Sequence, residues 1–505
     1  MPVGGISNLT EVNPEATAEW GRAGDEGTVR RWMSDAVDFA RALGATYADA
    51  RVVEIEEERV YGELKRDPDV RREHTLGIGV RVILGGMWGF GSRALGAADA
   101  PIAAAAGAVR MAASSPGGLA AAWAPLPPEI GTYHTEVHQD PFSVGLDRKQ
   151  RLLDEVLQVA RESPLVVSAL AGVNAKRQRR YFLSTEGSWQ IQTLVECGGV
   201  YQVWAAADGE VQRRSYPNSF HGNTGAGGWE FVESLGLLHE APRVVDEASA
   251  LLTAPQCPGG TADVIIGPAM TALQIHESCG HALELDRILG DEAGFAGTSF
   301  VEATGLGTFR YGSPAVSVVA DPTAVGVRGS FGFDDEGQAA KQTTLVDHGV
   351  VVDFLSSRES AARIGRRSTV SMRADGWQYM PLCFSTHVAL QPGQGSLQEL
   401  LAKLGDGYYL DMDRSWSIDE QRLNFQFGTE VAYEVKRGVK GKLMKNASYG
   451  GVTPQFWGSV EQVAGAEEAR VFGLPCGKGE PKQWGFVSHG SAPILVRGVR
   501  MGVAG

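Results

Sequence analysis

The stretch TALQIHESCGHALELD, residues 271–286, places two histidines and a glutamate close together in an apolar setting. Imidazole nitrogens are ordinary zinc ligands, and a carboxylate beside them can act as a general base. The pattern therefore predicts a buried metal-binding helix. Its candidate ligands are His276 and His281, and its candidate base is Glu277.

The spacing of the two histidines is unusual. In the common H-E-x-x-H helix they lie four residues apart and point to one side, because each residue turns the helix by about 100°. Here they lie five apart, which separates them by roughly 140° on a regular α-helix. A π-type turn, closed from i to i+5, would bring them together, and Gly280 favours it because it carries no Cβ. The alternative is a plain buried helix whose histidines bind backbone partners.

A catalytic zinc keeps three protein ligands and one open position, so one more donor must come from elsewhere. Of the five cysteines, Cys197 and Cys383 lie among apolar neighbours and are interpreted as small core residues, and Cys257 lies on a probable linker. Four candidates remain open on the residues alone: Cys279, Cys476, Glu284 and Asp286. Cys279 shares nearly the same helix face as His276, and Cys476 lies in a Gly/Pro-rich loop with little packing reason for a thiol.

These residues resemble the TldD/PmbA family of zinc-dependent peptidases. The family motif, H-E-x-x-x-H followed by a small residue, Leu-Glu and an Asp, matches the positions from His276 to Asp286. FGFDDEGQAAKQTTLVDHGVVVDFLSSRESA, residues 331–361, resembles the family's D-D-E-G segment and the hairpin that follows it. The family's zinc-binding cysteine, in a C-G-K loop, falls on Cys476.

The resemblance implies a zinc ion held by His276, His281 and Cys476, with Glu277 taking a proton from the metal-bound water that attacks a peptide carbonyl. Substrates would be unfolded peptides or flexible protein segments, which a β-rich groove could hold by strand addition. Family members act in pairs, one subunit carrying the zinc helix and the other lacking it. We therefore expect a homodimer, or a heterodimer with a homologous metal-free subunit.

Two other functions stay open. The chain could be a non-catalytic peptide-binding or assembly subunit with a structural zinc. It could also be a thiol hydrolase in which Cys476 is the nucleophile and His489 its base, since a Cys/His pair suffices for acyl transfer.

Composition favours a compact protein without nucleic-acid or membrane partners. The net charge of -14 opposes binding to phosphate backbones. The one basic cluster, AKRQRRY around residues 176–180, is interpreted as a solvated strand edge. An Ala-rich stretch at 94–122 is interrupted by charges and prolines, so it predicts a packed helix and not a membrane span. The polar start and the five scattered cysteines predict a cytoplasmic protein.

The periodicity predicts an α+β fold, in which an N-terminal α/β region of two small subdomains precedes a mostly antiparallel-β C-terminal domain that carries the zinc helix. The predicted units are an extension at 1–30, subdomains at 31–123 and 130–253, and a metallopeptidase domain at 262–505. We expect helices at 28–42, 100–113, 146–161 and 229–253. The expected strands are 48–65, 74–92, 166–175, 178–185, 189–198 and 201–207, with a hairpin turn at Asp208-Gly209.

Overall fold

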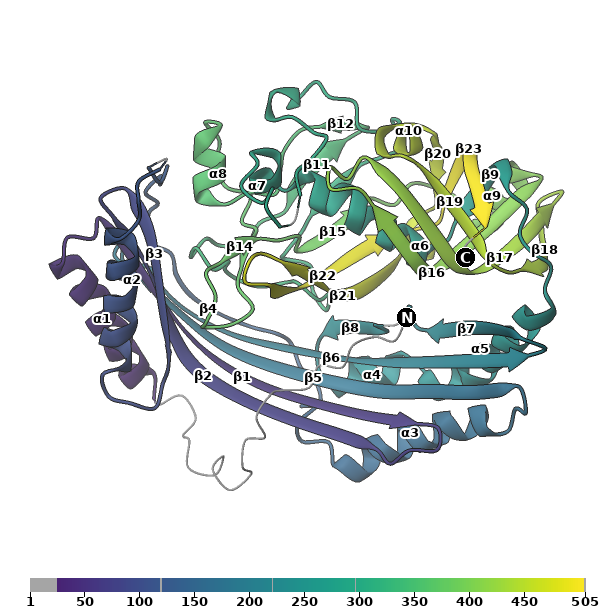
Figure 1. Ribbon diagram of the computed structural model, residues 1–505, viewed down its shortest axis with the longest axis horizontal. Helices are drawn as coiled ribbons and strands as arrows, with labels where there is room; N and C mark the ends of the chain where they lie inside the picture. Colours follow the sequence, from purple (N-terminus) through teal and green to yellow (C-terminus); the bar gives the residue numbers. More distant parts are fainter. Residues whose placement is uncertain (1–24, 119, 220, 296, 504–505) are drawn as a thin grey trace.

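The N-terminal half is built on one long, curved sheet (Figure 1). The computed structural model describes residues 25–118, 120–219, 221–295 and 297–503, so most of the predicted 1–30 extension lies outside the described residues. The eight-stranded sheet has the order β3-β2-β1-β5-β6-β4, with β7 and β8 also paired to β6. Its strands are β1 Tyr47–Glu63, β2 Asp69–Leu84, β3 Met87–Ala94, β4 Ile130–His134, β5 Val166–Ser184, β6 Trp189–Ala207, β7 Glu210–Tyr216 and β8 Asn223–Ala226. Both segments predicted as N-terminal subdomains contribute strands to it.

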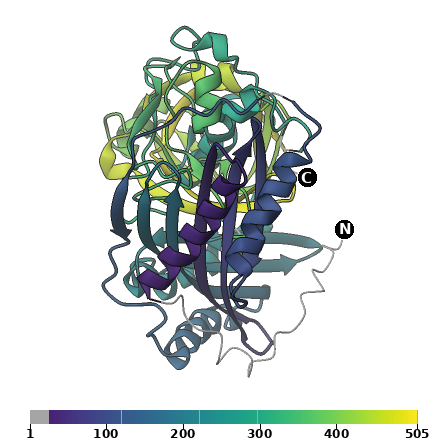
Figure 2. The same ribbon diagram turned by 90° about the vertical axis from the view of Figure 1, so that its left-hand side faces the viewer.

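Helices cover the convex face of this sheet. They are α1 Glu26–Ala42, α2 Ala100–Ala113, α3 Leu146–Arg161, α4 Trp229–Ser234 and α5 Leu237–Thr253. The first two lie side by side over β1 and β2, as Figure 2 shows, and the other three pack over β5 and β6. Alternate strand residues are apolar toward these helices, which buries two separate hydrophobic clusters.

Three predicted element boundaries are wrong. The strands β5 and β6 each run unbroken for 19 residues, where the sequence predicted four shorter strands. The single helix predicted at 229–253 is instead two helices, because Gly236 between them adopts a left-handed φ of 61°. The turn at Asp208-Gly209 is confirmed, with φ of 52° and 82° at its two residues.

The basic cluster predicted as a solvated strand edge lies instead in the middle of the sheet. Its strand, β5, is hydrogen-bonded to β1 on one side and β6 on the other. Lys176 and Arg180 are buried, and they form ion pairs with Asp375 and Asp335 of the C-terminal half. In the sequence, this run of basic residues is typical of a solvated strand. The structure differs because the acidic partners of these residues lie on other strands and on segments far along the chain.

The partners of the concave face of the sheet come largely from the D-D-E-G segment. Arg180 donates to Asp335 Oδ2 at 2.8 Å and to the Ala374 carbonyl at 2.9 Å. Arg81 lies 3.3 Å from Glu336 Oε1, and all of these charged side chains are buried. A buried charge that loses its partner is strongly destabilising, so these pairs hold the two halves in a fixed relation.

The C-terminal half contains two larger sheets and a two-stranded one. One sheet has six strands in the order β12-β11-β10-β15-β22-β21, and the other has the order β16-β9-β23-β19-β17-β18 with β20 paired to β23. The bounds are β9 Gly260–Ile266, β10 Val318–Ala320, β11 Thr343–Asp347, β12 Val350–Val351, β13 Met372–Arg373, β14 Leu382–Cys383, β15 His387–Leu390, β16 Gly407–Ile418, β17 Asn424–Lys436, β18 Val439–Met444, β19 Ala447–Val452, β20 Val460–Val463, β21 Arg470–Lys478, β22 Gln483–Ser491 and β23 Ile494–Val503. Most pairings are antiparallel, which confirms the α+β class with a β-rich C-terminal region.

The helix that begins the candidate site lies between these two sheets. It is α6 Pro268–Ile275, which follows β9 and contacts β16 of one sheet and β22, β21 and β15 of the other. Pro268 stands in its first turn, where the fixed φ of proline suits a helix start. The remaining helices are short: α7 Leu285–Ile288, α8 Arg358–Arg363, α9 Leu397–Leu404 and α10 Thr453–Gly458. No helix in the described ranges is both long and apolar enough to cross a bilayer.

Replacing Arg180 by Met should destabilise the protein by about 3–5 kcal/mol, because Asp335 is left with fewer partners for its buried charge. Urea unfolding followed by fluorescence measures the change. The matched control is Arg179→Met, one residue along the same strand but 44% exposed, which should shift stability by no more than about 0.5 kcal/mol. Equal effects of the two substitutions would contradict the role of the buried pair.

Candidate metal centre

The turn after α6 has the predicted π geometry. Residues His276–Gly280 form a π-helical turn, in which the His281 N–H donates to the His276 carbonyl, five residues back. The two imidazole rings consequently lie with their centroids 4.6 Å apart. Gly280 is required here by close approach, since a Cβ would meet Ser385 Oγ at 2.7 Å. The prediction of a π-type distortion is confirmed.

Strand β21 brings a thiol to the same place. Donor atoms of His276, His281 and Cys476 all lie within 4.8 Å of one another, and all three side chains are buried. His281 Nε2 lies 3.2 Å from Cys476 Sγ. Tetrahedral zinc–ligand bonds of about 2.0–2.3 Å require donor separations of this order, so the cluster fits one small cation.

Hydrogen bonds around His276 fix which ring nitrogen faces the cluster. His489 Nδ1 lies 3.0 Å from the Val388 carbonyl, which can only accept, so Nδ1 carries the proton. Burial holds the pKa of His489 well below its ordinary value, so the ring is neutral and its Nε2 is an acceptor. His276 Nδ1, 2.8 Å from that Nε2, is therefore the donor. The Nε2 lone pair of His276 is left for a cation.

His281 is oriented in the same way by a carboxylate. Its Nδ1 lies 3.1 Å from Glu284 Oε1, which leaves the Nε2 lone pair directed toward Cys476. Burial alone would raise the pKa of Glu284, but the positive charges of Lys478 and Arg287 outweigh it and hold that pKa well below its usual range. Lys478 Nζ and Arg287 Nε donate to Glu284 Oε2 at 2.9 and 2.7 Å. A carboxylate that holds a ligand histidine is a common feature of metal sites.

The candidate base lies beside the ligands. Glu277 is buried, and its Oε2 accepts a hydrogen bond from Arg422 Nη1, which comes from the turn between β16 and β17. The Glu277 carboxylate beside the two histidines is therefore paired with the guanidinium of Arg422. Sequence reasoning missed this arginine as a site residue, because it lies 145 residues along the chain from Glu277.

The rival third ligands have other roles. Cys279 is fully buried in the hydrophobic core, and burial raises the pKa of its thiol to about 12. Glu284 holds His281, and Asp286 Oδ2 accepts from Lys478 Nζ at 2.6 Å. None of these three belongs to the donor cluster found among the described residues.

The Cys476/His489 pair required by the alternative thiol hydrolase is not formed, since His489 binds His276 and Cys476 contacts His281. Burial and the charges of Glu284 and Glu277 raise the pKa of the Cys476 thiol well above its ordinary value. A thiol in such surroundings is a poor nucleophile when no cation stabilises its thiolate.

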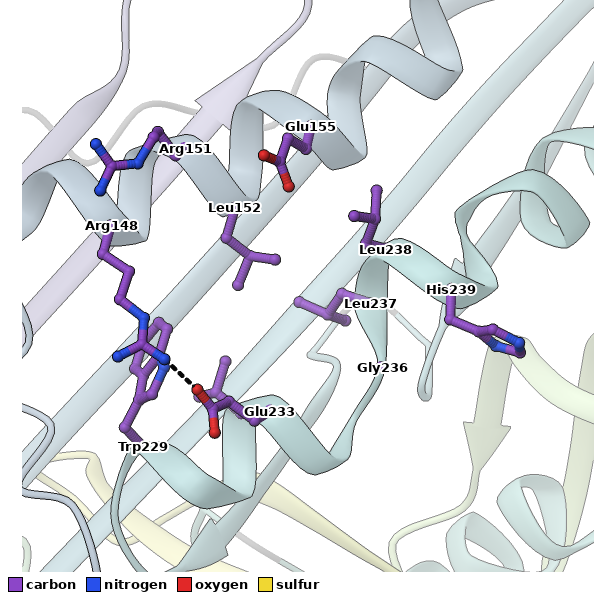
Figure 3. Close-up of a pocket in the computed structure, with 11 residues that line it drawn as sticks. Arg148, Arg151, Leu152, Glu155, Trp229, Glu233, Gly236, Leu237, Leu238 and His239 are labelled. Atoms are coloured by element: carbon purple, nitrogen blue, oxygen red, sulfur yellow. Dashed lines mark hydrogen bonds and ion pairs between the residues drawn. The ribbon is translucent and has the colours of Figure 1, made fainter.

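A separate hollow lies on the far side of the N-terminal sheet. It has a volume of about 390 Å³, and residues of α3, α4 and α5 line it, with Arg148 paired to Glu233 (Figure 3). None of the residues predicted for the metal centre lines this hollow.

Two protein-family models match this chain. Residues 259–503 match the PmbA/TldA metallopeptidase C-terminal domain, and residues 48–112 match domain 1 of the same metallopeptidases. Together the two matches span more than half of the chain. The chain belongs to the TldD/PmbA family.

Two archaeal TldD/PmbA relatives are named as metalloproteases. "Metalloprotease MJ0996" of Methanocaldococcus jannaschii is 31% identical over 273 residues, 54% of this chain and only 57% of its own length. A "Metalloprotease" of Methanothermobacter thermautotrophicus is 28% identical over 387 residues, 76% of this chain and 80% of its own. The solved structure of TldE from Thermococcus kodakarensis shares the fold, with a TM-score of 0.71 at 15% identity over 94% of this chain and 100% of that one.

Replacing His489 by Phe should lower metal affinity by about 10–100-fold, because His276 loses the acceptor that fixes its tautomer. Competition against a coloured chelator measures this affinity. His387→Gln is the matched control, since His387 is also buried, on the neighbouring strand β15, but bonds to Ser488 Oγ. Unchanged affinity in the Phe variant would show that His489 does not position His276.

Proposed function

We propose that this chain is a zinc-dependent peptidase that hydrolyses peptide bonds in unfolded peptides or flexible protein segments. The observation that carries the proposal is the convergence of His276, His281 and Cys476 beside the carboxylate of Glu277. Two imidazoles and a thiolate form a borderline-soft donor set, which suits zinc better than calcium or magnesium. Bound there, zinc would supply Lewis acidity toward water and the peptide carbonyl.

The chain's own groups perform the proton transfers. Glu277 accepts a proton from the water that attacks the peptide carbon, and later donates it to the amide nitrogen as the C–N bond breaks. The products are a carboxylate and an amine. Arg422 binds Oε2 of Glu277, so we assign Oε1 to the proton transfer.

Substrate binding by strand addition is part of the proposal. Cys476 lies on β21, which forms one edge of the six-stranded sheet. The Val471 carbonyl and the Gly473 N–H on this edge already bind the Asn223 side chain, so an added strand would pair with the part of β21 beyond Gly473. An extended peptide paired with such an edge is held mainly by main-chain hydrogen bonds, so most side chains would be tolerated. This binding mode requires an unfolded or flexible segment.

Assembly and location complete the proposal. We propose a homodimer, or a heterodimer with a homologous metal-free subunit, and light scattering of the purified chain with and without such a subunit distinguishes the two.

A cytoplasmic location is supported by the cysteines, all five of which are free.

Replacing Glu277 by Gln should leave the zinc content unchanged and lower turnover by about 100–10,000-fold, because the amide cannot accept the proton. A fluorogenic peptide assay and metal analysis by mass spectrometry measure the two quantities. Equal turnover in parent and variant would refute the proposed base.

The peptide assay and the metal analysis also distinguish the peptidase from the two alternative functions. A subunit with structural zinc would bind metal yet show no turnover in the parent protein. A thiol hydrolase would stay active with a chelator, whereas the proposed peptidase loses activity and regains it when zinc is restored. Cys476→Ser should release the metal as well as abolish turnover.

A further inference from the structure

Arg422 is held in a conformation that non-glycine residues rarely adopt. Its φ is 63°, in the turn that joins β16 to β17. Such a backbone costs on the order of 1–3 kcal/mol and persists only when its surroundings enforce it. Here the Arg422 N–H donates to the Asp419 carbonyl at 3.0 Å, and Thr453 Oγ1 donates to the Arg422 carbonyl at 2.7 Å. Both sides of the residue are thus fixed, and the side chain extends toward the metal centre.

The guanidinium uses only part of its hydrogen-bonding capacity. Nη1 donates to Glu277, while Nε is buried and has no hydrogen-bond partner within the described residues. The side chain is 16% exposed, so this unused donor is largely shielded from water. Glu277, which the guanidinium binds, directly follows the candidate ligand His276 in the π-helical turn. The guanidinium therefore lies beside the donor cluster, close to a charge that would form there.

The proposed reaction creates such a charge. When water attacks a peptide carbon, the carbonyl oxygen gains a negative charge, and preorganised donors aimed at that oxygen stabilise the transition state. A guanidinium has five N–H donors in a rigid fork, so one end can hold Glu277 while another edge binds an oxyanion.

We propose that Arg422 is a second catalytic side chain, which donates a hydrogen bond from its free edge to the carbonyl oxygen of the scissile peptide. This inference rests on the proposed peptidase function. Arg422 loses no proton and forms no covalent bond. Its charge offsets the negative charge on oxygen while Glu277 carries the proton from water to the leaving nitrogen.

A purely orienting role for Arg422 makes a different prediction. If the arginine only held Glu277 in place, its loss would slow proton transfer but would leave unchanged the affinity for a tetrahedral analogue. A phosphinic peptide is such an analogue. Its phosphinate group is already tetrahedral and negatively charged, so its binding requires no proton transfer by Glu277. Affinity for a phosphinic peptide therefore separates the two roles.

The experiment compares Arg422→Met and Arg422→Lys in the zinc-loaded protein, with Arg437→Met as the matched control. Arg437 is also a left-handed turn arginine, with φ of 49°, but it is exposed in the turn between β17 and β18. Arg422→Met should retain zinc and lower kcat by about 100–1,000-fold, the usual effect of removing an oxyanion donor, while KM stays near that of the parent. Its affinity for a phosphinic peptide should fall by a similar factor.

Arg422→Lys should have a kcat and a phosphinic-peptide affinity between those of the parent and the Met variant, since lysine keeps the positive charge but lacks the forked donors. Arg437→Met should match the parent in both quantities. Parent-like phosphinic affinity in both Arg422 variants would overturn the inference, as would loss of zinc from both. The peptidase proposal fails separately: Glu277→Gln would then retain full turnover, whatever Arg422 does.

Discussion

One backbone hydrogen bond determines the geometry of the centre. The His281 N–H donates to the His276 carbonyl, and this π closure brings onto one side two imidazoles that a regular α-helix would separate. The preceding helix α6 lies between the two C-terminal sheets, and Ser278 in the turn accepts a hydrogen bond from Trp457 Nε1 at 2.9 Å. The turn is therefore held by tertiary contacts, and the position of each donor follows from it.

Around this turn lies a shell of buried polar groups that fixes orientation and charge. His489 and Glu284 each hold one ligand histidine through Nδ1, so both present Nε2 to the cluster. Lys478, which is fully buried, forms ion pairs with Glu284 and Asp286 and also donates to the Cys383 carbonyl at 2.7 Å. Such a network is costly to desolvate and stable only when every member is paired, so the site is preorganised before a substrate arrives.

Buried ion pairs also hold the interface between the two halves of the chain. Arg180 and Arg81, from the concave face of the N-terminal sheet, meet Asp335 and Glu336 of the D-D-E-G segment. The curved sheet thus forms a fixed support for the C-terminal half that contains the metal centre (Figure 1).

The sequence predicted what local patterns encode. The fold class, the helices at 100–113 and 146–161 and the π distortion all follow from periodicity and spacing, and the structure confirms them. Convergence of distant segments is not encoded locally. Cys476 is 195 residues from His281. The residues alone left four candidates for the third ligand, and only the resemblance to the TldD/PmbA family indicated Cys476. Nothing near His489 or Arg422 in the chain marks them as site residues, and the charges of β5 resemble a solvated strand until their partners are known.

The decisive measurement is X-ray absorption spectroscopy at the zinc edge, because it counts the atoms bound to the metal in the purified chain. We expect about one zinc per chain, with two imidazole nitrogens near 2.0 Å, one sulfur near 2.3 Å and one further oxygen. Cys476→Ser should lose the zinc and with it the edge signal. A zinc shell without sulfur in the parent protein, or no bound zinc at all, would disprove the proposed three-ligand centre.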